Sequence, residues 1–459
     1  MRRGESGGDG VRGASLGRRA FVRGAVAAGA ALLGPRATRA AGRRSAPLLP
    51  PPEASGIEHV VVVMMENRSF DHLLGWHPNA DGRQAGLAYA DADGIVHPTF
   101  PLAPDFTGCG HPNPDHSYAG GREQYADGAM DGFLRSGASD EYTVGYYEED
   151  DRPILAALAR HFTTCDRAFC SILAPTFPNR LFLHCARTDR LDDQIRLTRL
   201  PTIWDRLAGA GVSARYYFSN VPFLALWGRR YVPISRSYDQ FLADAAAGAL
   251  PAVAFVEPRF TLGDAMPGND DHPHADVRAG DAFLYRTFRA LAEGSGWPGT
   301  VLVVTYDEWG GFFDHVSPPR APVSGLVDTD LSRGQALLGF RVPTIVASPF
   351  ARGAPADPRV ASQVLDHTSV LKLIEWRWTL APLSRRDASP VIGNLAGVLD
   401  FDHPDPSVPD LPEPPTPGAQ CPATESARVG RATPAEDQDR PWGSLARSPL
   451  VKGWPLGLG

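Results

Sequence analysis

Two runs of apolar, largely β-branched residues, each followed at once by acidic side chains, constrain the fold of this chain more than any other feature. Residues 59–65 are His-Val-Val-Val-Val-Met-Met, and residues 300–306 are Thr-Val-Leu-Val-Val-Thr-Tyr. A nearly continuous apolar run of this length is typical of a parallel strand that is buried on both faces of a sheet. Parallel strands are joined by crossover connections that usually contain helices, so the chain is expected to form an α/β sheet.

Further strand and helix patterns alternate along the chain and support this fold class. Strands are predicted over residues 213–218, 252–256 and 342–348, and helices over 154–162, 202–210, 276–293 and 366–378. From Phe401 onward the character changes, because seven prolines fall within residues 404–417. The tail to Gly459 is therefore predicted to be extended and loosely packed.

The N-terminus has the composition of an export signal. Arg18 and Arg19 are followed by Phe21, then by a Gly/Ala/Leu-rich run over 24–34 and by small residues around 37–41. A charged segment, a short apolar segment and a small-residue end are typical of such signals, and the paired arginines resemble the twin-arginine type. The alternative is an Ala-rich amphipathic helix.

These patterns predict four regions and an exported protein. They are a twin-arginine-type export signal over residues 1–41, a linker over 42–55, a catalytic domain over 56–380 and a Pro-rich extension over 381–459. The expected location is the bacterial periplasm or the medium, with the twin-arginine export machinery as a partner. After the signal no apolar run reaches the 18 residues that would indicate a transmembrane span.

Charge and cysteine content exclude other classes of protein. The net charge of −7 argues against a nucleic-acid partner, since such proteins usually carry a basic stripe. The five cysteines are scattered and form no Cys-x-x-Cys pair, so a zinc ribbon is not expected. An exported protein with this cysteine content could form one or two disulfides, and the odd number leaves at least one free thiol.

The side chains that follow the two strongest strands predict a metal site. Glu66 and Asn67 come directly after the first strand, and Asp307 and Glu308 after the second. Ligands of open α/β sheets bind at the carboxyl ends of the strands, where these residues would meet. They offer only oxygen atoms, which suits a hard divalent cation. The alternative is that Glu66 and Asp307 merely cap helices.

Thr176 is the candidate nucleophile. It precedes an apparent helix over residues 181–185, and the N-terminus of a helix favours anions. Asn179 and Arg180 could bind the oxygens of a phosphate, because the guanidinium of arginine presents paired donors. The alternatives are an N-cap role for Thr176 and a surface salt bridge for Arg180.

Four histidines lie in two polar loops. His111 and His116 belong to the loop over residues 108–121, and His272 and His274 to the run Asn-Asp-Asp-His-Pro-His-Ala-Asp over 269–276. Loops held by a rigid scaffold often carry catalytic residues, although a single loop histidine is more often merely solvated. The aspartates of 269–276 could form a calcium loop, but the ligand spacing of an EF-hand is absent.

Five ordered motifs resemble a known family. They are Glu-Asn-Arg-Ser-Phe-Asp-His (66–72), Thr-Phe-Pro-Asn-Arg (176–180), Asp-His-Pro (271–273), Asp-Glu-Trp-Gly-Gly-Phe-Phe-Asp-His-Val (307–316) and Gly-Phe-Arg-Val-Pro (339–343). Over residues 56–380 the chain resembles the phosphoesterase family of bacterial phosphatidylcholine-type phospholipases C, plant non-specific phospholipases C and a related acid phosphatase. This resemblance implies an alkaline-phosphatase-like α/β fold, with a mostly parallel sheet flanked by helices.

The resemblance also implies roles for individual residues. One divalent metal ion would be bound by Glu66, Asn67, Thr176, Asp307 and Glu308. Thr176 would be the nucleophile that forms a phosphothreonine, and His116 and His272 would surround the phosphate as catalytic residues. His274 departs from the plant pattern. The C-terminal β domains of the haemolytic bacterial members have no counterpart in the Pro-rich tail.

The implied activity is a phospholipase C reaction, which releases diacylglycerol and a phosphorylated head group from a phospholipid. A phosphomonoesterase resembling the acid phosphatase shares every one of these motifs and is the main alternative. A non-catalytic, metal-containing envelope binding protein is the second alternative. Sulfatases of this fold need a modifiable Cys or Ser in a Cys-x-Pro-x-Arg type of sequence, whereas this chain has Thr176 and the sequence Thr-x-Pro-Asn-Arg, which favours phosphate esters.

Overall fold

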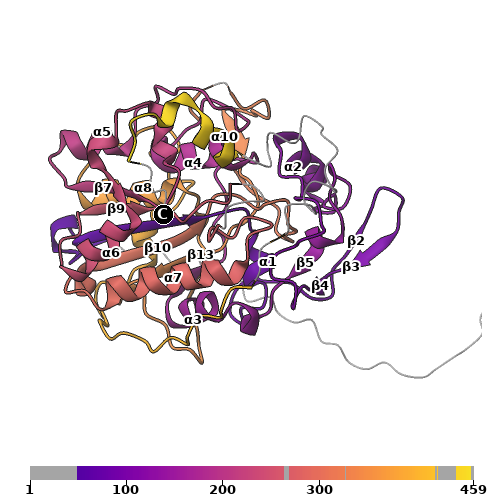
Figure 1. The fold of residues 1–459 in the computed structure, drawn as a ribbon, viewed down its shortest axis with the longest axis horizontal. Coiled ribbons are helices and arrows are strands. Elements are labelled where there is room, and N and C mark those ends of the chain that lie inside the picture. Colours follow the sequence, from indigo (N-terminus) through magenta and orange to yellow (C-terminus); the bar gives the residue numbers. More distant parts are fainter. Residues whose placement is uncertain (1–48, 263–267, 326, 419–420, 422–440, 456–459) are drawn as a thin grey trace, which may run out of the picture. The chain divides into compact units, whose positions relative to one another are not determined.

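A computed structural model describes residues 49–262, 268–325, 327–418, 421 and 441–455 (Figure 1). The predicted export signal over 1–41 and residues 42–48 of the predicted linker lie outside the described residues. Among the helices that the structure describes, none is both long enough and apolar enough to cross a membrane.

The centre of the molecule is an eight-stranded mixed sheet. In spatial order its strands are β14 (Val360–Ala361), β6 (Thr163–Cys165), β13 (Thr344–Ala347), β10 (Thr300–Tyr306), β1 (His59–Met65), β9 (Val253–Val256), β7 (Ala214–Phe218) and β8 (Ser235–Ser237). Neighbouring strands from β10 to β8 are parallel, and only β13 runs antiparallel to its neighbours β10 and β6. The predicted mostly parallel α/β sheet is confirmed.

Helices cover both faces of the sheet. The main ones are α3 (Pro153–His161), α4 (Thr176–Cys185), α5 (Ile203–Gly209), α6 (Tyr238–Ala246), α7 (Val277–Ala292) and α8 (Thr368–Arg377). The strands over 59–65 and 300–306 match their predicted bounds, and the other predicted elements match within one or two residues. Helix α4 is an exception, because it begins at Thr176 rather than at the predicted residue 181, and α6 was not predicted.

The alternation of side chains along β1 divides the core into two layers. Val61, Val63 and Met65 belong to the apolar cluster formed with α3 and α7, whereas Val60 and Val62 belong to the cluster formed with α4, α5 and α8. In Figure 1, α3, α6 and α7 lie below the sheet, and α4 and α5 lie above it. Because successive side chains of a strand point to opposite faces, a strand between two layers must be apolar throughout.

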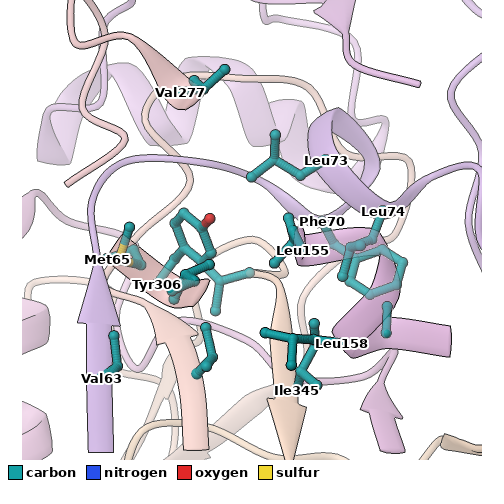
Figure 2. Close-up of a cluster of buried hydrophobic side chains, with 14 of the residues drawn as sticks. Val63, Met65, Phe70, Leu73, Leu74, Leu155, Leu158, Val277, Tyr306 and Ile345 are labelled. Carbon is teal, nitrogen blue, oxygen red and sulfur yellow. The ribbon is translucent and has the colours of Figure 1, made fainter. Parts of the chain in front are cut away.

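The first cluster also holds the carboxyl ends of the two central strands. Figure 2 shows Met65 at the end of β1 beside Tyr306 at the end of β10, with Phe70 and Leu73 of α1 (Phe70–Leu74) near them. All four side chains are completely buried. This packing fixes the chain on both sides of the segment between β1 and α1, so residues 66–69 have little freedom.

Shorter elements lie outside the central sheet. They are the strand pairs β2 (Ala88–Ala90) with β3 (Val96–Pro98), β4 (Phe100–Pro101) with β5 (Gly145–Tyr146) and β11 (Arg320–Pro322) with β12 (Gln335–Leu337), and the helix α2 (Tyr118–Tyr125).

The C-terminal region is packed more tightly than its composition predicts. Helix α10 (Pro441–Arg447) buries Trp442 and Leu445 in the cluster on the α4 side of the sheet, and Trp454 is buried as well. The prediction of a loosely packed tail was therefore wrong for residues 441–454. Proline content limits regular structure locally, but it does not prevent large apolar side chains further along the chain from joining a core.

Candidate active site

The two acidic turns lie side by side because β1 and β10 are paired in parallel. Met65 is the register partner of Tyr306, so the residues that follow them meet at the same edge of the sheet. The amide of Asp307 donates to the carbonyl of Met65 at 3.1 Å, and the amide of Asn67 donates to Oδ1 of Asp307 at 3.0 Å. Glu66, Asn67, Asp307 and Glu308 are all completely buried. Neither Glu66 nor Asp307 caps a helix.

A glycine makes this close approach sterically feasible. Gly310 has a positive φ of 64°, and a Cβ placed on it would lie 2.0 Å from the carbonyl oxygen of Asn67. Only a residue without a side chain fits there. The amide of Gly310 also donates to Oε2 of Glu308 at 2.6 Å, which orients that carboxylate.

Helix α4 brings Thr176 to the site at its first turn. Thr176 is the first helical residue and is 1% exposed, while Pro175 occupies the N-cap position and makes no side-chain cap. Asp193 instead accepts from the amide of Phe177 at 2.6 Å. Thr176 is therefore not the N-cap of this helix, and its Oγ1 has no hydrogen-bond partner among the residues that the structure describes.

Arg180, one helical turn after Thr176, lies among carboxylates. Its Nε donates to Glu66 at 2.9 Å and to Asp307 at 3.2 Å, and Nη1 donates to Glu257 at 2.7 Å. Burial alone would lower the pKa of Arg180, but Glu66 and Glu257 raise it, so the guanidinium stays charged. These contacts exclude the surface salt bridge. They also leave few donors for a substrate phosphate, so the predicted phosphate-binding role has no support in the geometry.

Asn179 shapes the segment that leads into α4. Its Nδ2 donates to the carbonyls of Ile172, Ala174 and Pro175 at 2.7–3.2 Å, and its Oδ1 accepts from the amide of Ile172. Both Nδ2 and Oδ1 of Asn179 are thus hydrogen-bonded to the backbone. Phosphate binding by Asn179 stays a prediction that these contacts do not favour.

Several buried oxygens of the predicted metal ligands lack hydrogen-bond partners within the described part of the chain. They are Oδ1 of Asn67, Oγ1 of Thr176 and Oε1 of Glu308. Burial, with Asp307 close by, raises the pKa values of Glu66 and Glu308 well above their ordinary range. Buried oxygens are almost always satisfied, and a hard cation stabilises both unsatisfied oxygens and buried carboxylates that repel one another. The residues present therefore fit a divalent metal ion.

A second acidic group fits a cation less well. Asp71, Asp314 and His315 have possible ligand atoms within 4.8 Å of one another. However, Arg341 donates to Asp71 and to Asp314 at 3.0 Å, and Asp71 also accepts from the ring of His315. Arg180 compensates Glu66 and Asp307 in the same way, but among the described residues every carboxylate oxygen of Asp71 and Asp314 has a hydrogen-bond partner. We therefore interpret this second group as a buried ion-pair network.

His116 lies beside Asn67 and Glu308, and His272 lies near His116. Nδ1 of each ring donates to a backbone carbonyl at 2.8 Å, of Pro114 for His116 and of Pro273 for His272. Asn67 Nδ2 donates to Nε2 of His116 at 3.2 Å. Burial lowers the pKa of His272 to about 3, and His116 contributes to this shift. His272 is therefore a neutral ring whose Nε2 can accept a proton.

The remaining loop histidines make other contacts. His111 pairs with Asp140 at 2.8 Å, a hydrogen bond that raises the pKa of His111, and Nε2 of His274 bonds to the carbonyl of His111 at 3.0 Å. Asp270 accepts from Thr261, and Asp276 caps α7. These aspartates have separate partners, so residues 269–276 do not form a calcium loop.

The phosphoesterase family model matches residues 57–381, which is most of the chain. The chain belongs to the phosphoesterase family. It is accordingly a hydrolase that acts on phosphoric ester bonds. The matched region contains both acidic turns, the N-terminal turn of α4 and the loops that carry His116 and His272.

Relatives of this phosphoesterase include plant and bacterial enzymes. Non-specific phospholipase C6 of Arabidopsis thaliana is 32% identical over 372 residues, which are 73% of this chain and 71% of the relative. Phospholipase C A of Mycobacterium tuberculosis is 32% identical over 428 residues, covering 77% of this chain and 79% of the relative.

Among solved structures, the phosphoesterase is similar to the phosphonate monoester hydrolase of Agrobacterium radiobacter. The sequence identity is 12% and the TM-score 0.35, with 76% of this chain and 78% of the other covered. The sulfatase PsFucS1 of Pseudoalteromonas has 9% identity and a TM-score of 0.38, with coverage of 76% and 73%. These distant similarities say nothing about the substrate.

Three further residues of the phosphoesterase contact the site and were not predicted. Glu257 follows β9 directly, so the argument from acids after strands could have identified it. Asp193 has a buried Oδ2 without a partner, and burial raises its pKa to about 7. Trp442 donates from Nε1 to Oε2 of Glu66 at 2.9 Å. For Asp193 and Trp442, no local sequence signal points to the site.

Proposed function

We propose that this phosphoesterase is an exported, metal-dependent phospholipase C that forms a phosphothreonine on Thr176. The observation that carries the proposal is that, within the described part of the chain, buried oxygens of Asn67, Thr176 and Glu308 have no hydrogen-bond partner, while the carboxylates of Glu66 and Asp307 are also fully buried. The names of the plant and mycobacterial relatives support the choice of a phospholipid substrate.

The five predicted ligands would hold one divalent cation. They are Glu66, Asn67, Thr176, Asp307 and Glu308. When bound, the cation would favour the ionised form of the threonine hydroxyl. Thr176 Oγ1 then attacks phosphorus in line with the leaving diacylglycerol oxygen, so that a P–O bond to Thr176 forms as the ester bond breaks.

His272 and His116 are suited to transfer the proton. Each ring is held through Nδ1, so protons are exchanged at Nε2, and in His116 this atom must first release its hydrogen bond from Asn67. Because His272 is neutral at the start, it can take the proton of the Thr176 hydroxyl and return it to the departing alkoxide. In the second half-reaction water attacks the phosphothreonine, which releases the phosphorylated head group and regenerates the hydroxyl.

Arg180 supports this chemistry from within the protein. Its buried positive charge offsets part of the repulsion among Glu66, Asp307 and Glu257. We assign it to holding these carboxylates rather than to the phosphate. The same contacts fix the first turn of α4, and with it Thr176, against the ends of the two central strands.

Export is supported by two features. Arg18 and Arg19 form the twin-arginine pattern, and Cys109 is joined to Cys421 by a disulfide, a bond typical of exported proteins. Replacing both arginines by lysine should keep the precursor in the cytoplasm. Undiminished appearance of the protein outside the inner membrane would refute this route.

The substrate class is tested by comparing two reactions of the same preparation. We expect release of diacylglycerol from phosphatidylcholine vesicles to exceed release of phosphate from a small monoester when each is measured as kcat/KM. A monoester preference would instead assign the chain to phosphomonoesterase activity. Failure of both reactions with a fully metal-loaded protein would favour a non-catalytic binding protein.

A further inference from the structure

The C-terminal segment 441–454 contacts one of the proposed metal ligands, Glu66, through Trp442. Trp442 and Leu445 of α10 are buried at 1% and 0% exposure. Trp454 donates from Nε1 to the carbonyl of Gly228 at 3.0 Å and packs edge-on against Phe218, 6.1 Å between ring centroids. The segment is thus anchored at two points by tryptophans that have different partners.

Trp442 is the anchor that reaches Glu66. Its indole stacks on Phe260 with the rings 6° from parallel and 3.5 Å between centroids, and the edge of Phe177 packs on it at 5.4 Å. The Arg180 guanidinium lies 4.9 Å from the centroids of both Trp442 and Phe260. These contacts leave the indole little freedom, so the direction of its N–H is fixed.

The two oxygens of Glu66 are held by different groups. Oε1 accepts from Arg180, and Oε2 accepts from Nε1 of Trp442 at 2.9 Å. A carboxylate with one donor could rotate about its last torsion, whereas two donors from different elements fix its plane. Trp442 therefore supplies the second constraint on this side chain.

We propose that Trp442 is a positioning residue that orients Glu66 for cation binding, so that the C-terminal segment completes the active site. The proposal rests on the proposed function, because it assumes that Glu66 is a metal ligand. Hydrogen bonds to ligating side chains typically change metal affinity or activity by about 10–100-fold when they are removed.

The test replaces the indole donor and keeps the ring. Trp442→Phe retains stacking on Phe260 but removes the N–H, and Trp454→Phe removes the equivalent donor at the other anchor. We expect Trp442→Phe to bind Mn²⁺ about 10–100-fold more weakly in a chelator competition, with a melting temperature in excess chelator close to that of Trp454→Phe. Trp454→Phe should keep the wild-type affinity for Mn²⁺.

A further variant distinguishes the loss of Glu66 orientation from a general loosening of the C-terminal segment. Leu445→Ala removes buried contacts of the same helix without touching Glu66, so it should lower the melting temperature and leave Mn²⁺ affinity nearly unchanged. If it weakens Mn²⁺ binding as much as Trp442→Phe does, the positioning role is refuted.

Two other outcomes distinguish the two proposals. If wild-type protein binds Mn²⁺ and Trp442→Phe binds it equally tightly, the positioning role of Trp442 is refuted. The proposed function is not affected by this result. If wild-type protein holds no divalent cation at all, the metal-dependent function is refuted, and the role of Trp442 with it.

Discussion

The amide of Asn67 donates to Oδ1 of Asp307 at 3.0 Å, which ties together two turns that are 240 residues apart in the chain. This bond holds because β1 and β10 are parallel neighbours that end in register at Met65 and Tyr306. The geometry of the site is therefore a direct consequence of strand pairing in the centre of the sheet.

Thr176→Val should abolish turnover without unfolding the protein. The substitution removes a hydroxyl that has no hydrogen-bond partner and keeps the side-chain volume, so the melting temperature should change little. Loss of a nucleophile should lower kcat by on the order of 10³ or more. Thr143→Val is the matched control, since its buried hydroxyl also lacks a partner. More than about a tenth of wild-type turnover in Thr176→Val would remove Thr176 from this role.

Removal of divalent cations should lower stability as well as activity. Without a cation, the buried carboxylates of Glu66, Asp307 and Glu308 repel one another, so exhaustive chelation should lower the melting temperature and Mg²⁺ or Mn²⁺ should restore it. Asp307→Asn should weaken cation binding, while Asp276→Asn, at the cap of α7, should not. Full activity and unchanged melting after chelation, with no metal found by elemental analysis, would contradict the metal site.

Arg180→Lys should destabilise the fold rather than weaken substrate binding alone. Lysine cannot bond Glu66, Asp307 and Glu257 together, and breaking a buried ion pair costs about 3–5 kcal/mol. Urea unfolding should show this loss. Arg215→Lys, in a partly exposed pair with Asp244, is the control and should lose less than about 1 kcal/mol. A large rise in KM at unchanged stability would instead support the phosphate-binding role.

Because of Asp193, the free energy of unfolding should decrease as the pH rises from about 4 to about 7. Burial raises its pKa to about 7 from an ordinary value of 3.8, so the folded protein binds its proton more tightly than the unfolded chain does. The stabilisation is complete below about pH 4 and is lost as the pH rises through 7.

Asp193→Asn should remove this dependence. The variant should be more stable than the wild type at pH 8 by about 1–4 kcal/mol, and the difference should vanish near pH 4. Urea unfolding in the presence of chelator measures it, with Asp192→Asn as the control. An unchanged pH profile in Asp193→Asn would show that Asp193 ionises normally.

The sequence by itself determined the sheet and the edge at which the site lies. The strands over 59–65 and 300–306 are recognisable because a segment buried on both faces must be apolar at every position. Acids that follow such strands are brought to one edge by any parallel pairing, so Glu66 and Asp307 could be placed together before the structure was known. Positions that depend on the apolar pattern and on the shared direction of parallel strands are therefore the ones that sequence predicts well.

The tertiary structure alone decided the partners of Arg180 and Trp442. The sequence allowed a phosphate ligand or a surface salt bridge for Arg180, and it predicted a loose tail for the region that contains Trp442. Arg180 is enclosed because α4 packs over the ends of β1, β10 and β9, and Trp442 meets Glu66 across 376 residues of chain. Contacts of this kind depend on how distant segments pack in space. The residues next to Arg180 and Trp442 in the chain do not indicate that packing.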